Sequence, residues 1–415
     1  MTFISTVRQR FRSLTRCDSI FDVVLINHAI LKLFGLTIYS VQKRSDGYKT
    51  TITPTDLLAL LRLLVMEGFV FYVCTFTMGR IQPTGSNIMD NAIRYSFLLS
   101  SFLISALSIG NYLRYGQIWN VWEKLDRFDQ RAIEMNAPID HGSHKRQLLQ
   151  SIAFIWFSCI LLAVLGNAAL SVDYGTLTVR LAIVFSFFCF NIPFGLINNN
   201  IFFTCQLVYR RLEHINEVFA VHFLPPKKLG LIMLNELPDI KNEHWDKTSL
   251  LQMLATQWDE MGQVTRMINS AFWGQIVYIS TTNMMVMTLS EFSFYRTLIT
   301  EDKRQRMMAE IYLQNGLFYE IMLVAVIGTF DAIKRQAEKT AVLVHKATRE
   351  VENLRLQDAL QYFSQQINYR PIVVSCGYFV CDWTMGMMII GTVASYVVIL
   401  VQFDDTLGLA MKKRP

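Results

Sequence analysis

The sequence predicts an all-α membrane protein with seven transmembrane helices, and three observations support this prediction. Of the 415 residues, 52% are apolar or aromatic and only 17% are charged, whereas soluble domains carry about 25% charged residues. The mean hydropathy is +0.29. The apolar residues also gather into runs of about 20 or more, which is the length that crosses a bilayer. This composition excludes a disordered chain, because such a chain needs low hydrophobicity and high net charge.

Seven runs are long and apolar enough to be predicted as spans. The last run is the clearest, because no charged residue lies between Trp383 and Phe403. A shorter apolar stretch at 23–38 contains His28 and Lys32, which favours an interfacial or buried helix over an eighth span. The predicted spans are 55–79, 91–115, 147–171, 175–204, 268–293, 310–331 and 381–404.

The distribution of basic residues predicts the orientation of these spans. With the N-terminus inside, the inner segments hold 27 Lys and Arg residues and the outer segments hold 8. Short loops rich in Lys and Arg stay in the cytosol, so we expect the N-terminus inside and the C-terminus outside. The predicted regions are 1–54 (cytosolic, with the short interfacial helix), 55–204 (spans 1 to 4), 205–267 (cytosolic helices), 268–331 (spans 5 and 6), 332–380 (cytosolic helices), 381–404 (span 7) and 405–415 (extracellular tail).

Three cytosolic segments are predicted to be amphipathic helices. The first, at 204–219, follows span 4 and is broken by Pro225, Pro226 and Gly230, and each of the other two carries a clear apolar face. In the segment before span 5, apolar residues recur every three or four positions and so share one face of a helix. It comprises Leu250, Leu254, Trp258, Met261 and Val264. The segment after span 6 predicts one further helix, closed by Pro371. Its face comprises Ile333, Ala337, Val344, Val351, Leu354 and Leu360. Both faces require apolar partners, either within one chain or between chains.

The sequence contains no arrangement of residues that predicts catalysis. It has no Walker loop, no GxSxG and no HExxH, and its seven histidines show no ligand spacing. Asp140, His141 and His144 lie in a predicted cytosolic loop, where we expect them to be solvated. The basic residues lie between apolar runs rather than in one patch, which argues against a nucleic-acid partner. We therefore predict no enzymatic activity, no metal and no cofactor.

The last span carries a recognisable pattern, GTVASYVVILVQF. This pattern resembles the C-terminal signature of insect gustatory receptors, which is Thr-Tyr, five apolar residues and Gln-Phe. Tyr396, Gln402 and Phe403 match it, and Ser395 keeps the hydroxyl of the Thr. The related insect olfactory co-receptor ends similarly. The LFGL sequence at 33–36 and the AVLVHK sequence after span 6 extend the resemblance.

The resemblance implies a tastant-gated, non-selective cation channel in the plasma membrane of sensory neurons. Such receptors are homotetramers, or heterotetramers with other gustatory receptors, set in membrane lipid and held together by a cytosolic anchor domain. The last span of each subunit lines the pore. We expect Ile399, Gln402 and Phe403 to form the gate, because they share one helical face. Asp404 and Asp405 are expected to attract cations at the outer mouth.

The resemblance also implies a ligand pocket in the outer part of spans 2 to 6, where aromatic and amide side chains are dense. The candidate residues are Tyr95, Phe97, Asn167, Phe187, Asn191, Tyr278, Thr282, Tyr312, Asn315 and Tyr319. The expected ligand is a bitter compound or another non-volatile tastant. Sugar receptors of the family usually carry Glu where this chain has Val397, so fructose or another sugar is the alternative.

Two other classes of seven-helix protein fit the sequence less well. A metabotropic receptor would have the opposite orientation, and the chain lacks the DRY-like triplet, the NPxxY motif and the outer-loop cysteines of that class. A transporter would be expected to show internal repeats or broken helices. The sequence shows no clear repeat, and Pro193 is interpreted as a kink in span 4.

Overall fold

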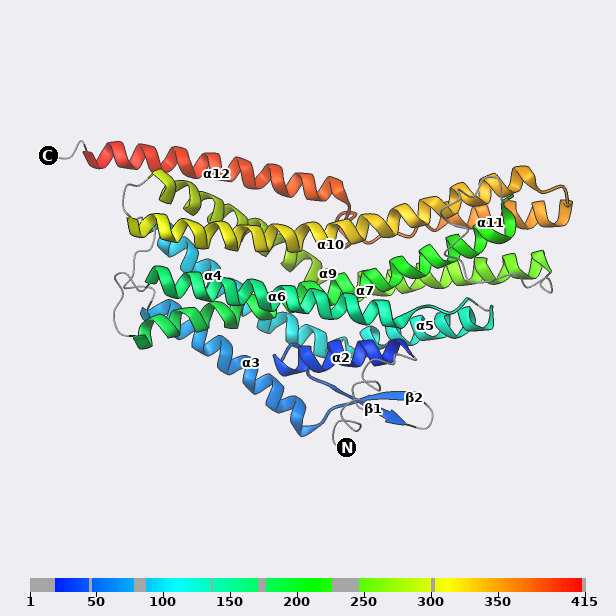
Figure 1. Ribbon diagram of the computed structural model, residues 1–415, viewed down its shortest axis with the longest axis horizontal. Coiled ribbons are helices and arrows are strands. Elements are labelled where there is room, and N and C mark those ends of the chain that lie inside the picture. The colour runs from blue at the N-terminus through cyan, green and yellow to red at the C-terminus, as the bar shows by residue number, and fades with distance from the viewer. Residues whose placement is uncertain are drawn as a thin grey trace, which may run out of the picture.

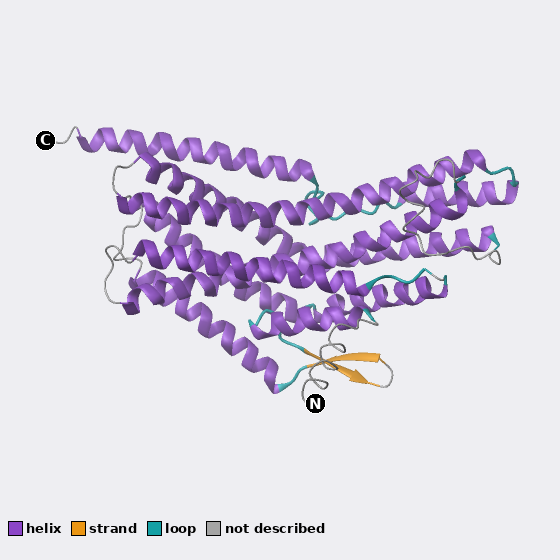
Figure 2. Cartoon of the chain, viewed as in Figure 1, coloured by secondary structure: helices purple, strands orange, loops and turns teal. Residues whose placement is uncertain are grey.

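The computed structural model describes residues 19–44, 47–77, 87–135, 137–170, 177–225, 246–299 and 303–412. These residues form an elongated helical bundle with one two-stranded sheet beside it (Figures 1 and 2). The elements are α2 (Ile20–Leu33), β1 (Ser40–Arg44), β2 (Gly47–Thr51), α3 (Pro54–Tyr72), a π-helical turn η1 (Val73–Thr77), α4 (Asn87–Leu113), α5 (Tyr115–Glu134), α6 (His141–Leu170), α7 (Leu177–Phe223), α9 (Lys247–Ile299), α10 (Lys303–Glu350), α11 (Leu354–Tyr369) and α12 (Trp383–Lys412). The all-α prediction is therefore confirmed for the described residues.

Three of the helices are much longer than a bilayer is thick. α7, α9 and α10 contain 47, 53 and 48 residues. At about 1.5 Å per residue they extend roughly 70–80 Å, more than twice the hydrocarbon core of a membrane. They pack against one another along the bundle (Figure 1). α7 ends at Phe223, just before Pro225, and the extension of these helices beyond the membrane stays a prediction.

The single helix predicted after span 6 is wrong, because the chain breaks at residues 351–353. Asn353 caps the new helix α11, and its Oδ1 accepts from the backbone N–H of Arg355 at 3.0 Å. α11 then packs against α10 and α9. The apolar spacing does not reveal the break, although Leu354 at the break is 74% exposed.

The first amphipathic face finds its partner within the same chain. All five of its residues are buried, and the Trp258 indole makes an edge-to-face contact with Phe363 of α11, with ring centroids 6.1 Å apart. This face therefore forms part of the core of a single protomer, and it is not available to another subunit.

Five described helices are long and apolar enough to cross a membrane, namely α3, α6, α7, α10 and α12. The other two predicted spans fall on α4, which contributes a shorter apolar helix, and on the more polar α9. The count of seven spans and their orientation thus stay predictions.

α2 packs against α5 and α6. The turn after α2 requires glycine at position 35, because the φ of Gly35 is +74° and a Cβ there would lie 2.4 Å from the carbonyl oxygen of Ala59.

Candidate functional site

Two of the predicted pocket residues meet in the centre of the bundle. Tyr319 of α10 donates its hydroxyl to Oδ1 of Asn191 on α7 at 3.0 Å, and both side chains are fully buried. The ring of Phe194, which follows Pro193 in α7, lies 4.6 Å from that of Tyr319. This is a polar contact enclosed by aromatic rings, which is the kind of group that orients a small molecule in an otherwise apolar site.

α9 places further predicted residues in the same interior. The hydroxyl of Tyr278 lies 3.5 Å from the carbonyl oxygen of Ser100 on α4, and Thr282 is buried one turn further along. Asn315 of α10 donates through Nδ2 to the hydroxyl of Ser290 on α9 at 3.0 Å. The structure therefore brings five of the ten predicted pocket residues into the core between α4, α7, α9 and α10.

The remaining predicted residues lie further out. Phe187 and Tyr312 pack against one small apolar cluster between α6, α7 and α10. Tyr95 and Asn167 are exposed on the single chain. Phe97 lies on α4, but its side chain is outside the described part of the chain.

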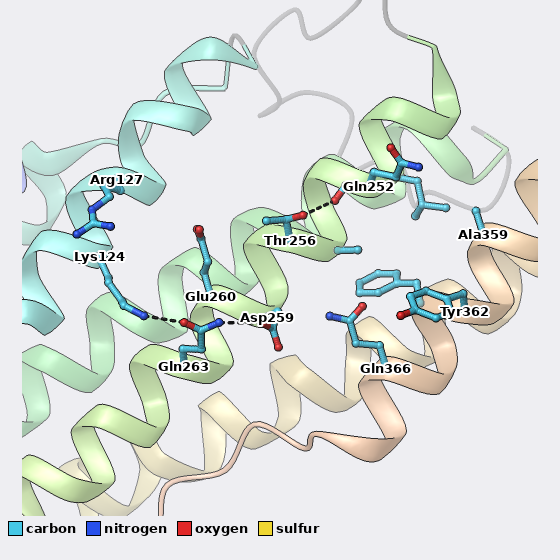
Figure 3. A pocket seen from close by; sticks show the side chains of 13 residues that line it. Lys124, Arg127, Gln252, Thr256, Asp259, Glu260, Gln263, Ala359, Tyr362 and Gln366 are labelled. Atoms are coloured by element: carbon cyan, nitrogen blue, oxygen red, sulfur yellow. Dashed lines mark hydrogen bonds between the residues drawn. The ribbon is translucent and has the colours of Figure 1, made fainter.

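A groove of about 790 Å³ lies elsewhere, between α5, α9 and α11 (Figure 3). Its wall is strongly polar: Lys124 donates to Gln263 at 2.6 Å, and Gln263 donates to Asp259 at 2.9 Å. Burial opposes the ionisation of Asp259, but hydrogen bonds from Gln263 and Arg370 hold its pKa below the usual range. None of the predicted pocket residues lines this groove, so the predicted ligand pocket stays a prediction.

The predicted gate residues lie in the second half of α12. In a single chain Ile399 is 42% exposed and Phe403 is 64% exposed, and Gln402 is exposed as well. Asp404 and Asp405 belong to α12, but their side chains are outside the described residues. The side chains of residues 394–403 are exposed or half-buried, and α12 lies at the edge of the bundle (Figure 1).

The motif residues that precede the gate are exposed in the same way. Ser395 is exposed and donates its hydroxyl to the carbonyl oxygen of Gly391 within α12, at 2.8 Å. Tyr396 is 51% exposed. Neither residue is part of the core of the single chain.

A buried charge cluster was missed by the sequence analysis. Arg211 of α7 forms an ion pair with Asp129 of α5, with 2.5 Å between Nη2 and Oδ2; the Arg211 side chain is 0% exposed and that of Asp129 is 6% exposed. His141 approaches the same carboxylate at 3.8 Å, and His144 packs beside His141. The expectation that these two histidines are solvated is wrong, because α6 begins at His141 and turns both rings into the bundle.

A third buried histidine lies in the 23–38 stretch, for which an interfacial or buried helix was predicted. His28 of α2 lies beside a small cavity of about 30 Å³, with its Nε2 3.0 Å from the carbonyl oxygen of Tyr39. Burial lowers the pKa of His28 from 6.5 to about 4, so the imidazole is neutral at pH 7 and Nε2–H donates to that carbonyl. The sequence predicts that this helix is interfacial or buried, but it does not reveal that the His28 side chain faces the core.

The fold and these placements can be compared with known proteins. A model of the family described as 7tm chemosensory receptor matches residues 24–407. The chain belongs to this family. It is a family of receptors rather than enzymes, so the prediction of a non-enzymatic, multi-pass membrane receptor is confirmed.

Sequence similarity to individual relatives is low. The chain is 25% identical over 144 residues to putative gustatory receptor 28b of Drosophila melanogaster, covering 33% of this chain and 30% of that protein. It is 23% identical over 168 residues to gustatory receptor for sugar taste 43a of the same species, covering 39% and 38%. The matched stretch thus spans about a third of each relative.

Structural similarity extends much further. The insect olfactory receptor OR5 from Machilis hrabei matches with a TM-score of 0.60 at 8% identity, over 96% of this chain and 99% of that one. The same receptor in complex with eugenol also gives 0.60, at 10% identity, over 92% and 97%. The chain therefore has the fold of an insect olfactory receptor along nearly its whole length.

Proposed function

We propose that this chemosensory receptor is a ligand-gated, non-selective cation channel of sensory-neuron plasma membranes, assembled from four subunits around a pore lined by α12. The observation that carries the proposal is the run of residues 394–403 of α12, which is mostly apolar and is exposed or half-buried in the single chain. A soluble protein would bury such a surface, and a helix surrounded only by lipid would not need Gln402 and the following acidic pair. Four copies around an axis would use these residues.

The proposed ligand is a small non-volatile tastant bound between α4, α7, α9 and α10. Bitter compounds remain the first class, because Val397 replaces the Glu common in sugar receptors. The similarity to a sugar-taste receptor of Drosophila favours fructose or another sugar as the second candidate. In either case the Asn191–Tyr319 hydrogen bond is the proposed polar anchor of the site.

The tetramer is proposed to close through α12 and the exposed surfaces of the cytosolic helices. Trp258 is buried within one chain, so Trp258→Ala is expected to destabilise the fold of the single protomer before it affects assembly. A purified receptor that stays monomeric by mass photometry would contradict the tetramer.

Whole-cell recording from cells that express only this chain tests the proposal. A panel of fructose, sucrose, caffeine and quinine should contain a compound that evokes a cation current within milliseconds, and the current should survive inhibition of G proteins. A metabotropic receptor would lose the response on G-protein inhibition and would carry its C-terminus inside. An epitope after Pro415 that is labelled only in permeabilised cells would therefore contradict the channel.

Tyr319→Phe tests the pocket in the same recordings. It keeps the ring and removes the hydroxyl that donates to Asn191, so the dose–response curve should shift by about fivefold to tenfold, the equivalent of one buried hydrogen bond. Tyr369→Phe is the matched control, because Tyr369 at the end of α11 is 85% exposed and is not among the residues that line the groove. An unchanged curve for Tyr319→Phe at normal surface expression would place the pocket elsewhere.

A further inference from the structure

The segment that carries α12 is an extended linker, residues 370–382, between α11 and α12. Its side chains alternate as in a strand: Ile372, Val374 and Cys376 are buried. The linker then reverses at Gly377, whose φ is +87°, and Cys381 donates its N–H back to the carbonyl oxygen of Val374 at 2.9 Å. The linker is thus an ordered structure rather than a loose connection.

A single side chain of α9 replaces the neighbouring strand that this linker lacks. The Nδ2 of Asn269 donates to the carbonyl oxygen of Val373 at 3.0 Å, while its Oδ1 accepts from the N–H of Ser375 at 3.1 Å. One amide therefore pairs with a backbone donor and a backbone acceptor, as a second strand would. Two turns earlier on the same face of α9, Gly262 lies against the side chain of Ile372.

Two ion pairs hold the ends of the linker. At its beginning, Arg370 donates to Oδ1 of Asp259 on α9 at 3.0 Å. At its end, Lys334 of α10 donates to Oδ2 of Asp382 at 3.0 Å, and Oδ1 of that carboxylate accepts from the N–H of Thr384 in the first turn of α12. Both pairs are partly exposed, so each contributes little to stability, and Asn269 itself is half-buried.

The packing of α12 is one-sided along its length. Its first half buries Met385, Ile389 and Val393, which recur every four residues. The described residues beyond Val393 are exposed or half-buried as far as Phe403. α12 is therefore packed against the bundle near the linker, whereas its side chains from 394 to 403 make few contacts with the rest of the chain.

We infer that Asn269 is a positioning residue for gating, which holds the linker as the fixed pivot about which α12 tilts. The inference rests on the proposed channel function. Phe403 lies about 30 Å along the helix from Trp383, so a tilt of about 5° about the pivot moves the gate by roughly 2.5 Å. If the linker itself shifts by about 2.5 Å when α12 is pushed, the helix is displaced at its base instead of tilting, and Phe403 does not move relative to the other subunits.

The test replaces Asn269 with residues that have the same number and branching of side-chain heavy atoms. Asn269→Leu removes both hydrogen bonds, and Asn269→Asp keeps only the acceptor for Ser375. Thr256→Val is the control, because it also removes a polar group from α9, but the Thr256 hydroxyl bonds only to the carbonyl oxygen of Gln252 in its own helix. The probe is whichever of fructose, sucrose, caffeine and quinine evokes the largest wild-type current.

The measurement is single-channel open probability, with and without the probe, in patches from cells whose surface receptors are counted. The ratio of evoked to basal open probability should fall at least fivefold in Asn269→Leu and by less in Asn269→Asp, with no change in Thr256→Val. A purely structural role would lower the number of surface channels and leave this ratio unchanged, which would overturn the inference. If Asn269→Leu does not reach the surface, an unchanged ratio in Asn269→Asp overturns it. Absence of any wild-type current would instead overturn the proposed function, and this inference with it.

Discussion

Removal of one partner from the buried Arg211–Asp129 ion pair is expected to destabilise the receptor strongly. Arg211 is fully buried, and besides the carboxylate it donates only to the carbonyl oxygen of Leu207, at 2.8 Å, among the hydrogen bonds of the described residues. In Asp129→Leu the guanidinium charge remains in the core without its counter-ion. Moving it to water would require the opening of the contacts between α5, α6 and α7.

The expected cost can be set from the burial of the pair. Breaking a buried ion pair by removal of one partner typically costs about 3–5 kcal/mol, whereas apolar replacement of both partners is often close to neutral. We therefore expect Asp129→Leu and Arg211→Met each to cost about 3–5 kcal/mol, and the double variant to cost less than either. Glu123→Gln on the same helix is the control. It breaks an exposed pair with Arg127, 3.9 Å apart, and should cost less than about 1 kcal/mol.

Fluorescence-detected thermal unfolding of the purified receptor in one detergent can rank the four variants. The single variants should melt well below wild type, the double variant between them and wild type, and Glu123→Gln with wild type. If the double variant melts at or below the lower of the two singles, the unpaired charge is not the cause of the loss. The side chains themselves, or His141 beside them, would then matter more than the pairing.

The remaining predictions concern the pore and the N-terminal helix. Phe403→Ala should raise the basal current per surface receptor, because a ring of four Phe403 side chains is proposed to exclude water from the closed pore; a variant no leakier than wild type yet still responsive to ligand would remove Phe403 from the gate. Gln402→Ala should mainly lower the open-state conductance measured in single channels. Asp404→Asn combined with Asp405→Asn should reduce cation conductance, most strongly at low ionic strength, where screening is weakest, and equal conductance with wild type in low salt would place these carboxylates away from the ion path. The pKa of His28 is about 4 in the folded protein and 6.5 in the unfolded chain, so the unfolded chain binds the proton more readily and the receptor loses stability as the pH falls from 6.5 to 4. The loss of unfolding free energy over this range is about 3 kcal/mol. His28→Gln should therefore make the melting temperature decline less between pH 7.5 and pH 5. An equally steep decline in this variant would assign the pH dependence to other groups.

The sequence predicted the helices well because their signals are local. Apolar runs, the face at Leu250–Val264 and the prolines after α7 and α11 each act within a few turns of one helix. The break before α11 was missed because the apolar spacing continues across it, so only the cap at Asn353 marks it.

The polar interior could be predicted only in part. Asn191 and Tyr319 were selected because the resemblance implies a pocket in the outer part of spans 2 to 6, where amide and aromatic side chains are dense, but 128 residues separate them and nothing in the sequence pairs them. Arg211 and Asp129 lie 82 residues apart, on helices that appear ordinary and amphipathic. The contacts of Asn269 with the linker were missed for the same reason, since a backbone partner leaves no trace in the sequence. Long-range polar pairing depends on how the helices cross, which no local pattern encodes.

The weak coverage of α12 also has a consequence for how the receptor is made. α12 adds three buried apolar side chains, Met385, Ile389 and Val393, to a core that otherwise lies between α5, α7, α9, α10 and α11. Because chains emerge from the ribosome at about 5–20 residues per second and fold as they emerge, the bundle can form before its last helix is synthesised. A chain that ends at Asp382 should therefore fold and reach the membrane without conducting. Co-expressed with the full chain, such a fragment would compete for places in the assembly, and early termination would act as a dominant trait rather than a simple loss.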